Sequence, residues 1–182
     1  MLEQGDSAVA SKPETRTLRV LFPSALGELG LELRGQTITR LVIGPEGEEN
    51  ASFTPFEDLD DSEFLDELFG RLSEYFAGAR KNLELSFDLG PAGLPRFDNR
   101  VLHEVAKIPY GRTRTYQKIA AAAGQPDGYR QVLAVLVANP IPVVIPCHRV
   151  VTNKSGIGSY IAGKDKKRWL LDLERENLAD AS

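Results

Sequence analysis

Cys147 and His148 are adjacent in the chain, and this pair is the sequence feature with the clearest capacity for chemistry. A cysteine thiolate attacks electrophiles, and a neighbouring base or positive charge lowers the pKa of the thiol. Adjacent side chains in an extended segment point in opposite directions, so a contact between the two requires a kink, for which Pro146 is placed, or a bridging water. Because cysteine is also among the most frequently buried residues, the pair alone leaves a purely structural role open.

The cysteine count restricts other kinds of chemistry. Cys147 is the only cysteine, so the chain forms no internal disulfide, which favours a reducing cytoplasm. One cysteine and two histidines fall short of the usual four ligands of a structural zinc site, and we expect no bound metal. No apolar run approaches the ~20 residues that span a membrane, and the N-terminus lacks the features of a signal peptide. We therefore expect a cytoplasmic protein without membrane contacts.

The elements that must position the thiol lie in the second half of the chain, where apolar residues recur at helical spacing. We predict helices over 97–108 and 116–123, and a third helix from 129 to the Asn139-Pro140 pair with Asp127 or Gly128 as its cap. An extended apolar segment should follow over 141–151. The last predicted element is a helix over 164–176, with Trp169, Leu170 and Leu173 facing inward. A short turn containing Gly124 joins the second helix to the third, which predicts a helix-turn-helix.

The first half of the chain shows a different pattern. After a tail over 1–15 that we expect to be disordered, apolar and polar residues alternate, which predicts an antiparallel meander of strands. The predicted elements are strands over 18–24, 27–35 and 36–44, an acidic exposed loop over 45–61, a helix over 64–76 capped by Ser62, and a strand over 83–89. The Gly- and Pro-rich stretch 90–95 is the predicted boundary between domains over 16–92 and 93–178.

The charge distribution changes at the same boundary. Residues 1–95 contain 8 Lys+Arg and 18 Asp+Glu, whereas residues 96–182 contain 14 Lys+Arg and 8 Asp+Glu. The net charge of −4 therefore conceals a basic C-terminal half, and attraction to phosphate depends on the local field. This distribution favours nucleic acid as a partner of the second half.

The residues around Cys147 form a longer motif. The segment 139–150 reads Asn-Pro-Ile-Pro-Val-Val-Ile-Pro-Cys-His-Arg-Val, and it resembles the active-site signature of the O6-alkylguanine-DNA alkyltransferases, also called methylated-DNA–protein-cysteine methyltransferases. The segments 108–116 and 156–174 are similar to the family as well, so the resemblance covers roughly residues 97–176. It implies an α/β (α+β) fold: a small ribonuclease-H-like N-terminal domain, followed by a mostly helical winged-helix or helix-turn-helix domain.

The resemblance implies single-turnover repair in which Cys147 takes the alkyl group from O6 of guanine and keeps it. His148 would act through a water, with Glu174 at the far end of this proton relay (Cys147, His148 and Glu174), and Asn139 would brace the active-site turn. The DNA contacts would come from Arg130, as a finger replacing the flipped nucleotide, from Tyr116 at the target phosphate, and from Gln131, Arg112 and Arg114. The lesion pocket would be lined by Tyr160, Val150, Ile161, Ala162 and Pro142. No cofactor is implied, and the implied partner is duplex DNA carrying O6-alkylguanine, or O4-alkylthymine, bound by a monomer.

Two segments depart from the family pattern. Arg130-Gln131-Val132-Leu133 replaces the usual Arg-Ala-Val-Gly, so bulkier side chains face the minor groove. Ile161-Ala162-Gly163 replaces a small residue followed by two glycines, which restricts the pocket. We therefore predict that methyl groups are transferred and that bulky groups such as benzyl are transferred poorly.

Other interpretations of these residues remain open. A non-catalytic sensor would flip the alkylated base and recruit other repair proteins, although its relatives lack the cysteine. A transcriptional regulator would use the helix-turn-helix alone, and a cysteine hydrolase would need an oxyanion motif that the sequence lacks. We interpret His103 as structural and the charged run 164–168 as a solvated helix face.

Overall fold

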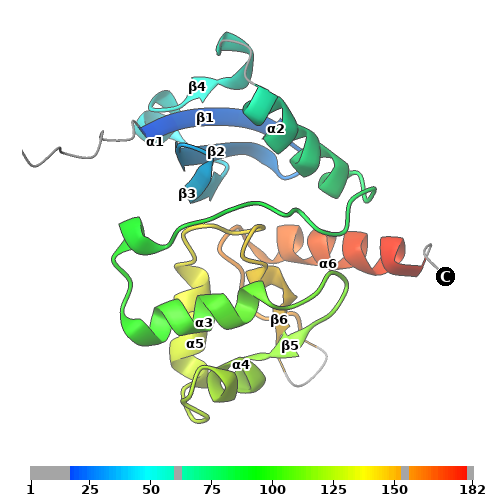
Figure 1. Ribbon diagram of the computed structural model, residues 1–182. Helices are drawn as coiled ribbons and strands as arrows, with labels where there is room; N and C mark the ends of the chain where they lie inside the picture. The colour runs from blue at the N-terminus through cyan, green and yellow to red at the C-terminus, as the bar shows by residue number, and fades with distance from the viewer. Residues whose placement is uncertain (1–16, 60–62, 153–155, 180–182) are drawn as a thin grey trace, which may run out of the picture.

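A four-stranded sheet forms the N-terminal half of the computed structural model, which describes residues 17–59, 63–152 and 156–179. Strands β1 (Thr17–Ser24), β2 (Gly27–Arg34) and β3 (Thr37–Ile43) form an antiparallel meander, as predicted, and β4 (Thr54–Pro55) pairs parallel to β1. The strand order is β3-β2-β1-β4 (Figure 1). A side chain at Gly30 would collide with the ring of Phe53 at 2.7 Å, so this glycine lets the segment before β4 pack on the sheet.

The acidic segment 45–61 is not a plain loop, contrary to the prediction. It contains a short helix α1 (Gly47–Ala51), β4 and a 3-10 turn η1 (Phe56–Asp58). Phe53 is buried, and Phe56 packs edge-on against Phe69 at 4.4 Å. These apolar residues anchor the acidic segment on the core, a tertiary effect that local composition does not reveal.

Helix α2 (Glu63–Phe76) packs on the sheet through its apolar face, where Phe69 stacks on Phe22 of β1 at 4.4 Å. Its span confirms the predicted helix, whereas the predicted cap Ser62 lies outside the described residues. The predicted strand over 83–89 is wrong. Glu84 has a φ of 51°, which interrupts the extended backbone, and pairing is limited to a single bridge between Ile38 and Phe87.

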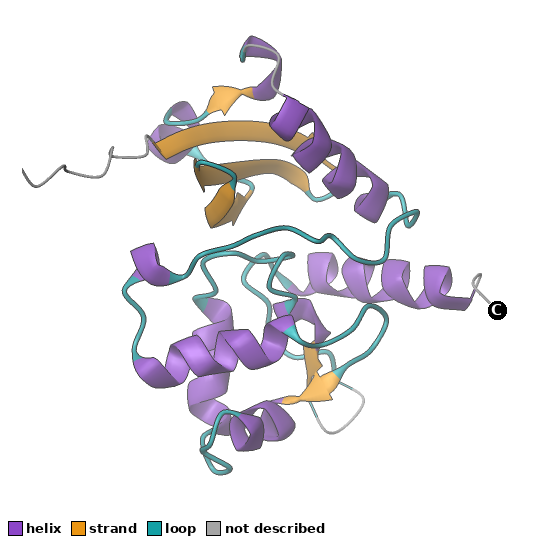
Figure 2. Ribbon diagram, viewed as in Figure 1, coloured by secondary structure: helices purple, strands orange, loops and turns teal. Residues whose placement is uncertain are grey.

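The second half is mostly helical, as Figure 2 shows. Its elements are η2 (Gly90–Ala92), α3 (Arg96–Ala106), β5 (Arg114–Thr115), α4 (Tyr116–Ala122), α5 (Tyr129–Val137), η3 (Cys147–Arg149), β6 (Val150–Val151) and α6 (Lys164–Ala179). The side chain of Thr115 caps α4 by accepting a hydrogen bond from the backbone N–H of Lys118. Helix α5 begins at Gly128 without a side-chain cap, and it packs against α3 and α4. The predicted helices are therefore present in the predicted order.

The segment 141–149 is not extended, contrary to the prediction, and only Val150–Val151 at its end form a strand, β6. The backbone N–H of Ile145 donates to the carbonyl of Ile141 at 2.9 Å, and Val143 has a φ of 74°, so the chain turns before it reaches the 3-10 turn η3. The prolines of this segment donate no backbone hydrogen bond and so disfavour regular strand pairing. The result is a compact turn that places Cys147 at the start of η3.

Helix α6 also differs from its predicted inward face. Leu170 is fully buried, as predicted, but Trp169 is 37% exposed, and its ring lies beside that of Phe76, with ring centroids 6.2 Å apart. The buried stripe of α6 instead runs through Lys167, Leu170 and Glu174. Two charged residues therefore face the interior, which means that they must find partners there.

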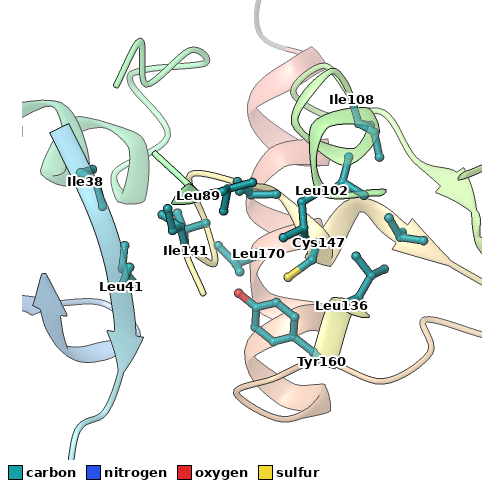
Figure 3. Packing of buried hydrophobic residues seen from close by; sticks show 14 of the residues in the cluster. Ile38, Leu41, Leu89, Leu102, Ile108, Leu136, Ile141, Cys147, Tyr160 and Leu170 are labelled. Atoms are coloured by element: carbon teal, nitrogen blue, oxygen red, sulfur yellow. The ribbon is translucent and has the colours of Figure 1, made fainter. Parts of the chain in front are cut away.

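The two halves share one continuous cluster of buried apolar side chains. In Figure 3, Ile38 and Leu41 of β3 lie on one side of this cluster, and Leu89 and Ile141 lie between β3 and the active-site segment. The backbone N–H of Leu41 donates to the carbonyl of Pro140 at 2.8 Å. The sheet thus contacts the hinge that precedes Cys147, while independent folding of 16–92 and 93–178 stays a prediction.

Candidate active site

Cys147 is 2% exposed at the start of η3, and its sulfur points toward the ring of Tyr160 (Figure 3). Burial raises the pKa of the Cys147 thiol to about 11, and the nearby Asn139 amide and Lys167 charge offset this increase only in part. At neutral pH the resting residue is therefore a protonated thiol. A nucleophilic role requires that a base remove the proton when substrate is present.

His148 is fully buried, and its Nε2 lies 2.9 Å from Oε1 of Glu174. Burial lowers the pKa of His148, although the hydrogen bond from Nε2 to Glu174 opposes this effect. The carboxylate can only accept, so Nε2 carries the proton in the neutral ring and Nδ1 is the free acceptor. Among the described residues Nδ1 has no hydrogen-bond partner, which leaves it available to take a proton through a water.

Glu174 is 1% exposed and is the hydrogen-bond hub of the site. Besides His148, it accepts hydrogen bonds from Arg149 at 2.8–3.0 Å, from the hydroxyl of Tyr75 at 2.6 Å and from the backbone N–H of Gly111 at 2.9 Å. Burial raises the pKa of Glu174, but the hydrogen bonds and charges of His148 and Arg149 outweigh it and bring the pKa to about 2. Glu174 is therefore a carboxylate throughout the physiological range.

Asn139 makes two hydrogen bonds within the loop that precedes Cys147. It is buried, its Nδ2 donates to the carbonyl of Ile145 at 3.0 Å, and its Oδ1 accepts from the backbone N–H of Ile141 at 3.1 Å. Together these bonds close the loop before η3. The same amide stabilises the thiolate form of Cys147, so one residue supports both the turn and the nucleophile.

Lys167 lies in the interior, which corrects the interpretation of the run 164–168 as a solvated face. Its side chain is fully buried, and Nζ donates to the carbonyls of Val150 at 2.6 Å and Ser159 at 3.0 Å. Nζ also lies 5.9 Å from the centre of the Tyr116 ring. Burial lowers the pKa of Lys167 to about 8, and the nearby Cys147 opposes that shift.

Sequence reasoning missed three residues of this site, namely Lys167, Arg149 and Tyr75. The burial of Lys167 could have been inferred from its helical spacing to Leu170 and Glu174, which places the three residues on one stripe of α6. Arg149 belongs to the motif around Cys147 and donates from Nη1 to the carbonyl of Ile108 at 2.6 Å. Tyr75 gave no signal beyond the apolar periodicity of α2, because its partner lies 99 residues away.

The predicted pocket residues fall into two groups. Tyr160 and Val150 are buried beside Tyr116, which is predicted to contact DNA and is buried as well. The charge of a Cys147 thiolate raises the pKa of both tyrosines after the larger effect of burial. Both tyrosine hydroxyls lack a hydrogen-bond partner among the described residues. Pro142, Ile161 and Ala162 line a cavity of about 420 Å³, together with Asn139 and residues 40–43 of β3.

Four of the predicted DNA-contacting residues, Arg130, Gln131, Arg112 and Arg114, are exposed, whereas the fifth, Tyr116, is buried. Arg130 and Gln131 lie at the start of α5, Arg112 lies on the turn after α3, and Arg114 begins β5. The guanidinium of Arg130 stacks on the ring of Tyr129 at 5.7 Å. Along α5, Tyr129, Leu133 and Val137 are at least 38% exposed at a spacing of four residues, so they form an apolar stripe on one helix face.

The chain matches the family model described as the 6-O-methylguanine DNA methyltransferase DNA-binding domain over residues 96–176. It is 38% identical to the methylated-DNA–protein-cysteine methyltransferase of Methanosarcina barkeri, over 68% of this chain and 77% of that protein. Identity to the constitutive enzyme of that name from Bacillus subtilis is 36%, over 82% of this chain and 90% of the relative.

Solved structures give the same result. The Mycobacterium tuberculosis O6-methylguanine methyltransferase matches with a TM-score of 0.75 and 30% identity, over 89% of this chain and 94% of that one. The same organism's OGT in complex with DNA also matches with a TM-score of 0.75, at 32% identity, over 87% of this chain and 93% of that one. These findings favour the transferase over the non-catalytic sensor. They confirm the predicted α+β fold class and DNA as the partner, and they show that the chain belongs to the methylated-DNA–protein-cysteine methyltransferase family of DNA-repair enzymes.

Proposed function

We propose that this protein transfers the alkyl group of O6-alkylguanine in duplex DNA to Cys147, in a single irreversible turnover and without a cofactor. O4-alkylthymine is a second candidate substrate of the same chemistry. The observation that supports the proposal most is the buried network in which His148, held by Glu174 through Nε2, presents a free Nδ1 on the turn that carries Cys147.

The reaction balances without any further reactant. The thiol proton of Cys147 passes through a water to Nδ1 of His148, and the thiolate attacks the alkyl carbon. A sulfur–carbon bond forms as the carbon–oxygen bond breaks, and the electron pair of that bond goes to the base. The base becomes guanine by taking up one proton from water, and His148 returns its proton to water, so no net proton is gained or lost. The thioether has no route back to the thiol, so each molecule acts once. General-base assistance of this kind contributes about 10²–10⁴ in rate.

Recognition in this proposal depends on extruding the damaged nucleotide, because O6 is inaccessible inside the duplex. Arg130 fills the gap, since a planar guanidinium stacks on bases; in the free protein it already stacks on Tyr129. Tyr116 meets the target nucleotide and its phosphate, and its buried hydroxyl, which has no hydrogen-bond partner within the described ranges, supports this role. Gln131, Arg112 and Arg114, all exposed, contact the groove and the backbone.

The extruded base enters a pocket formed by Tyr160, Val150, Pro142, Ile161 and Ala162. The backbone N–H of Ile161 donates to O6, a contact that does not depend on its side chain. Ile161 is 41% exposed, so its branched side chain stands at the surface beside the cavity of about 420 Å³. This bulk supports the prediction that methyl is transferred faster than benzyl.

We propose further that the protein acts as a monomer in the cytoplasm. The lesion chemistry uses side chains of one chain alone, and the exposed stripe of α5 is assigned to DNA. Within the described ranges, no helix is long and apolar enough to cross a bilayer. The single thiol also needs a reducing compartment to stay competent.

The test is intact-protein mass after incubation with a duplex that carries O6-methylguanine. The wild-type chain is expected to gain one methylene mass, and Cys147→Ser to gain none while it still retards the duplex in a gel. Binding without a mass gain in the wild type would establish the sensor instead. A parallel duplex with O6-benzylguanine tests the pocket, and equal rates for the two adducts would contradict the size restriction.

A further inference from the structure

Tyr75 reaches the active site from the other half of the molecule. It lies near the C-terminal end of α2, the helix that packs on the N-terminal sheet, and only 1% of its surface is exposed. Its hydroxyl donates to Oε1 of Glu174 at 2.6 Å and lies 3.4 Å from Nε2 of His148. The N-terminal half therefore contributes a hydrogen-bond donor to the site that carries the chemistry.

We propose that Tyr75 is a positioning residue for alkyl transfer: its hydroxyl holds the Glu174 carboxylate in the orientation that keeps His148 bound through Nε2 and leaves Nδ1 as the base. This inference rests on the proposed function, since it assigns a further residue to the same reaction. It also assigns the N-terminal half a direct part in the chemistry, beyond support of the fold.

The geometry at Oε1 of Glu174 explains why one hydroxyl matters. This oxygen accepts from Tyr75, His148 and Arg149 at once, and hydrogen bonds to a buried charge are about twice as strong as neutral ones. Arg149 and Tyr75 approach the carboxylate from different elements, η3 and α2, so together they restrict its rotation. A carboxylate fixed in this way can orient His148 by a single hydrogen bond.

The same hydroxyl affects how readily His148 accepts a proton. A donor on Oε1 reduces the negative potential that His148 experiences, so the ring stays neutral and able to act as a base. The titratable and charged groups around His148 are Glu174 and Lys167 on α6, Arg149 and Cys147 on η3, Tyr75 on α2 and Tyr160 before α6. Removal of the Tyr75 hydroxyl leaves the charge of Glu174 less compensated, and it should raise the pKa of His148.

Tyr110 provides a matched control within the same aromatic cluster. Its ring packs edge-on against Tyr75 at 5.9 Å and is also buried, but its hydroxyl makes no hydrogen bond within the described part of the chain. Tyr75→Phe and Tyr110→Phe therefore each remove one buried phenol oxygen, and only the first removes a bond to Glu174. A purely structural role for Tyr75 predicts similar effects of the two changes.

The experiment measures the rate constant of methyl transfer at saturating protein, the protein concentration at half-saturation, and the pH profile of the rate. We expect Tyr75→Phe to lower the rate constant about 10- to 100-fold, the range for a misplaced catalytic group, and to move the acidic limb to higher pH. The half-saturation value should not change. In the background of Glu174→Gln, Tyr75→Phe should cause little further loss. An unchanged rate and pH profile, or equal losses in both tyrosine variants, would overturn the proposal.

A second measurement does not depend on transfer. The chain has two histidines, and the exposed His103 serves as an internal reference for a titration of ring nitrogens by NMR. Tyr75→Phe should raise the pKa of His148. If the variant does not fold, the NMR spectrum of the wild type still tests the hydrogen bond between Tyr75 and Glu174. The Tyr75 hydroxyl proton should resonate downfield and be protected from exchange with solvent, and a rapidly exchanging proton would refute the hydrogen bond. If the wild type gains no mass but His148 shifts as expected, the proposed function fails while the positioning contact stands.

Discussion

The active-site network behind Cys147 and the exposed face of α5 are close in sequence but built on opposite principles. In the network, Asn139, His148, Arg149 and Glu174 are at most 8% exposed. Hydrogen bonds hold Asn139 within its own loop and tie the other three side chains to other elements. On α5, the exposed guanidinium of Arg130 makes a hydrogen bond and a cation–π contact with the side chain of its neighbour Tyr129. The chemistry is thus fixed before DNA arrives, whereas the recognition surface retains its side-chain freedom.

This difference has a physical basis. A general base must hold its geometry within a narrow range, and buried charge-assisted hydrogen bonds supply that rigidity when every partner is satisfied. A groove-binding face must adapt to a flexible duplex, and exposed side chains lose little packing energy when they change conformation. We expect substitutions in the network to affect stability and rate strongly, and substitutions on α5 to affect DNA affinity alone.

The largest effect on stability should follow from Glu174→Ala. The change leaves the buried guanidinium of Arg149 without its counter-charge, and loss of one partner of a buried pair costs about 3–5 kcal/mol. Urea denaturation measures the free energy of unfolding directly. Asp172→Ala is the control on the same helix, because its ion pair with Arg175 is exposed and should contribute about 1 kcal/mol or less. If the two variants lost the same free energy of unfolding, the distinction between the buried network and the surface would not hold.

Lys167→Met should separate rate from stability. Removal of the buried ammonium relieves its desolvation cost but leaves two buried carbonyls without a donor, and because these effects oppose each other the free energy of unfolding at pH 7 should change little. The carbonyls of Val150 and Ser159 lose their donor, and misplacement of these pocket walls should slow methyl transfer about 10- to 100-fold. A variant that transfers methyl at the wild-type rate would assign Lys167 to folding alone.

The pH dependence of stability checks the charge state of Lys167. Burial lowers the pKa of Lys167 to about 8 in the folded state, against ~10.4 in the unfolded chain. The unfolded state therefore binds the proton more tightly between these values. Relative to Lys167→Met, the wild type should gain stability as pH rises from about 8 to ~10.4, and the difference between the two should be constant below pH 8. A flat difference across the whole range would contradict the buried cation.

Arg130→Ala should affect DNA binding without disturbing the network. Loss of one stacking contact with bases corresponds to about tenfold weaker binding, seen as a higher half-saturating DNA concentration in the transfer assay. The free energy of unfolding should stay within about 0.5 kcal/mol of wild type, because Arg130 is exposed. Arg130→Lys keeps the charge but not the planar group and should not restore affinity. Full recovery with lysine would indicate a phosphate contact in place of stacking.

The smallest effect should come from Leu133→Ala. Leu133 is 38% exposed on the apolar stripe of α5, so its truncation should change stability by no more than about 0.5 kcal/mol. A smaller side chain allows closer approach to the minor groove, and DNA affinity should rise about two- to threefold by fluorescence anisotropy. Weaker binding would show instead that the stripe makes favourable contacts of its own.

Local patterns predicted much of the architecture. The meander β1–β3 followed from alternating polarity, and helices α2, α3, α4 and α5 followed from apolar spacing, because both patterns report which face is buried. Predictions failed at 83–89, where the left-handed Glu84 interrupts the strand, and at 141–149, where the turn closed by Asn139 replaces an extended segment. In both places backbone conformation depends on contacts that composition does not encode.

The sequence by itself determined the family and pointed to Cys147 and His148 as the candidate nucleophile and base, because these depend on residue types at short spacing around Cys147. Only the tertiary structure decided which charges are buried. Lys167 and Glu174 look like members of a solvated helix until α6 packs its 167–170–174 stripe inward, where each charge requires partners from other elements. Tyr75 could be placed at Glu174 only by the fold, since a hydrogen bond between residues 99 positions apart leaves no trace in local periodicity.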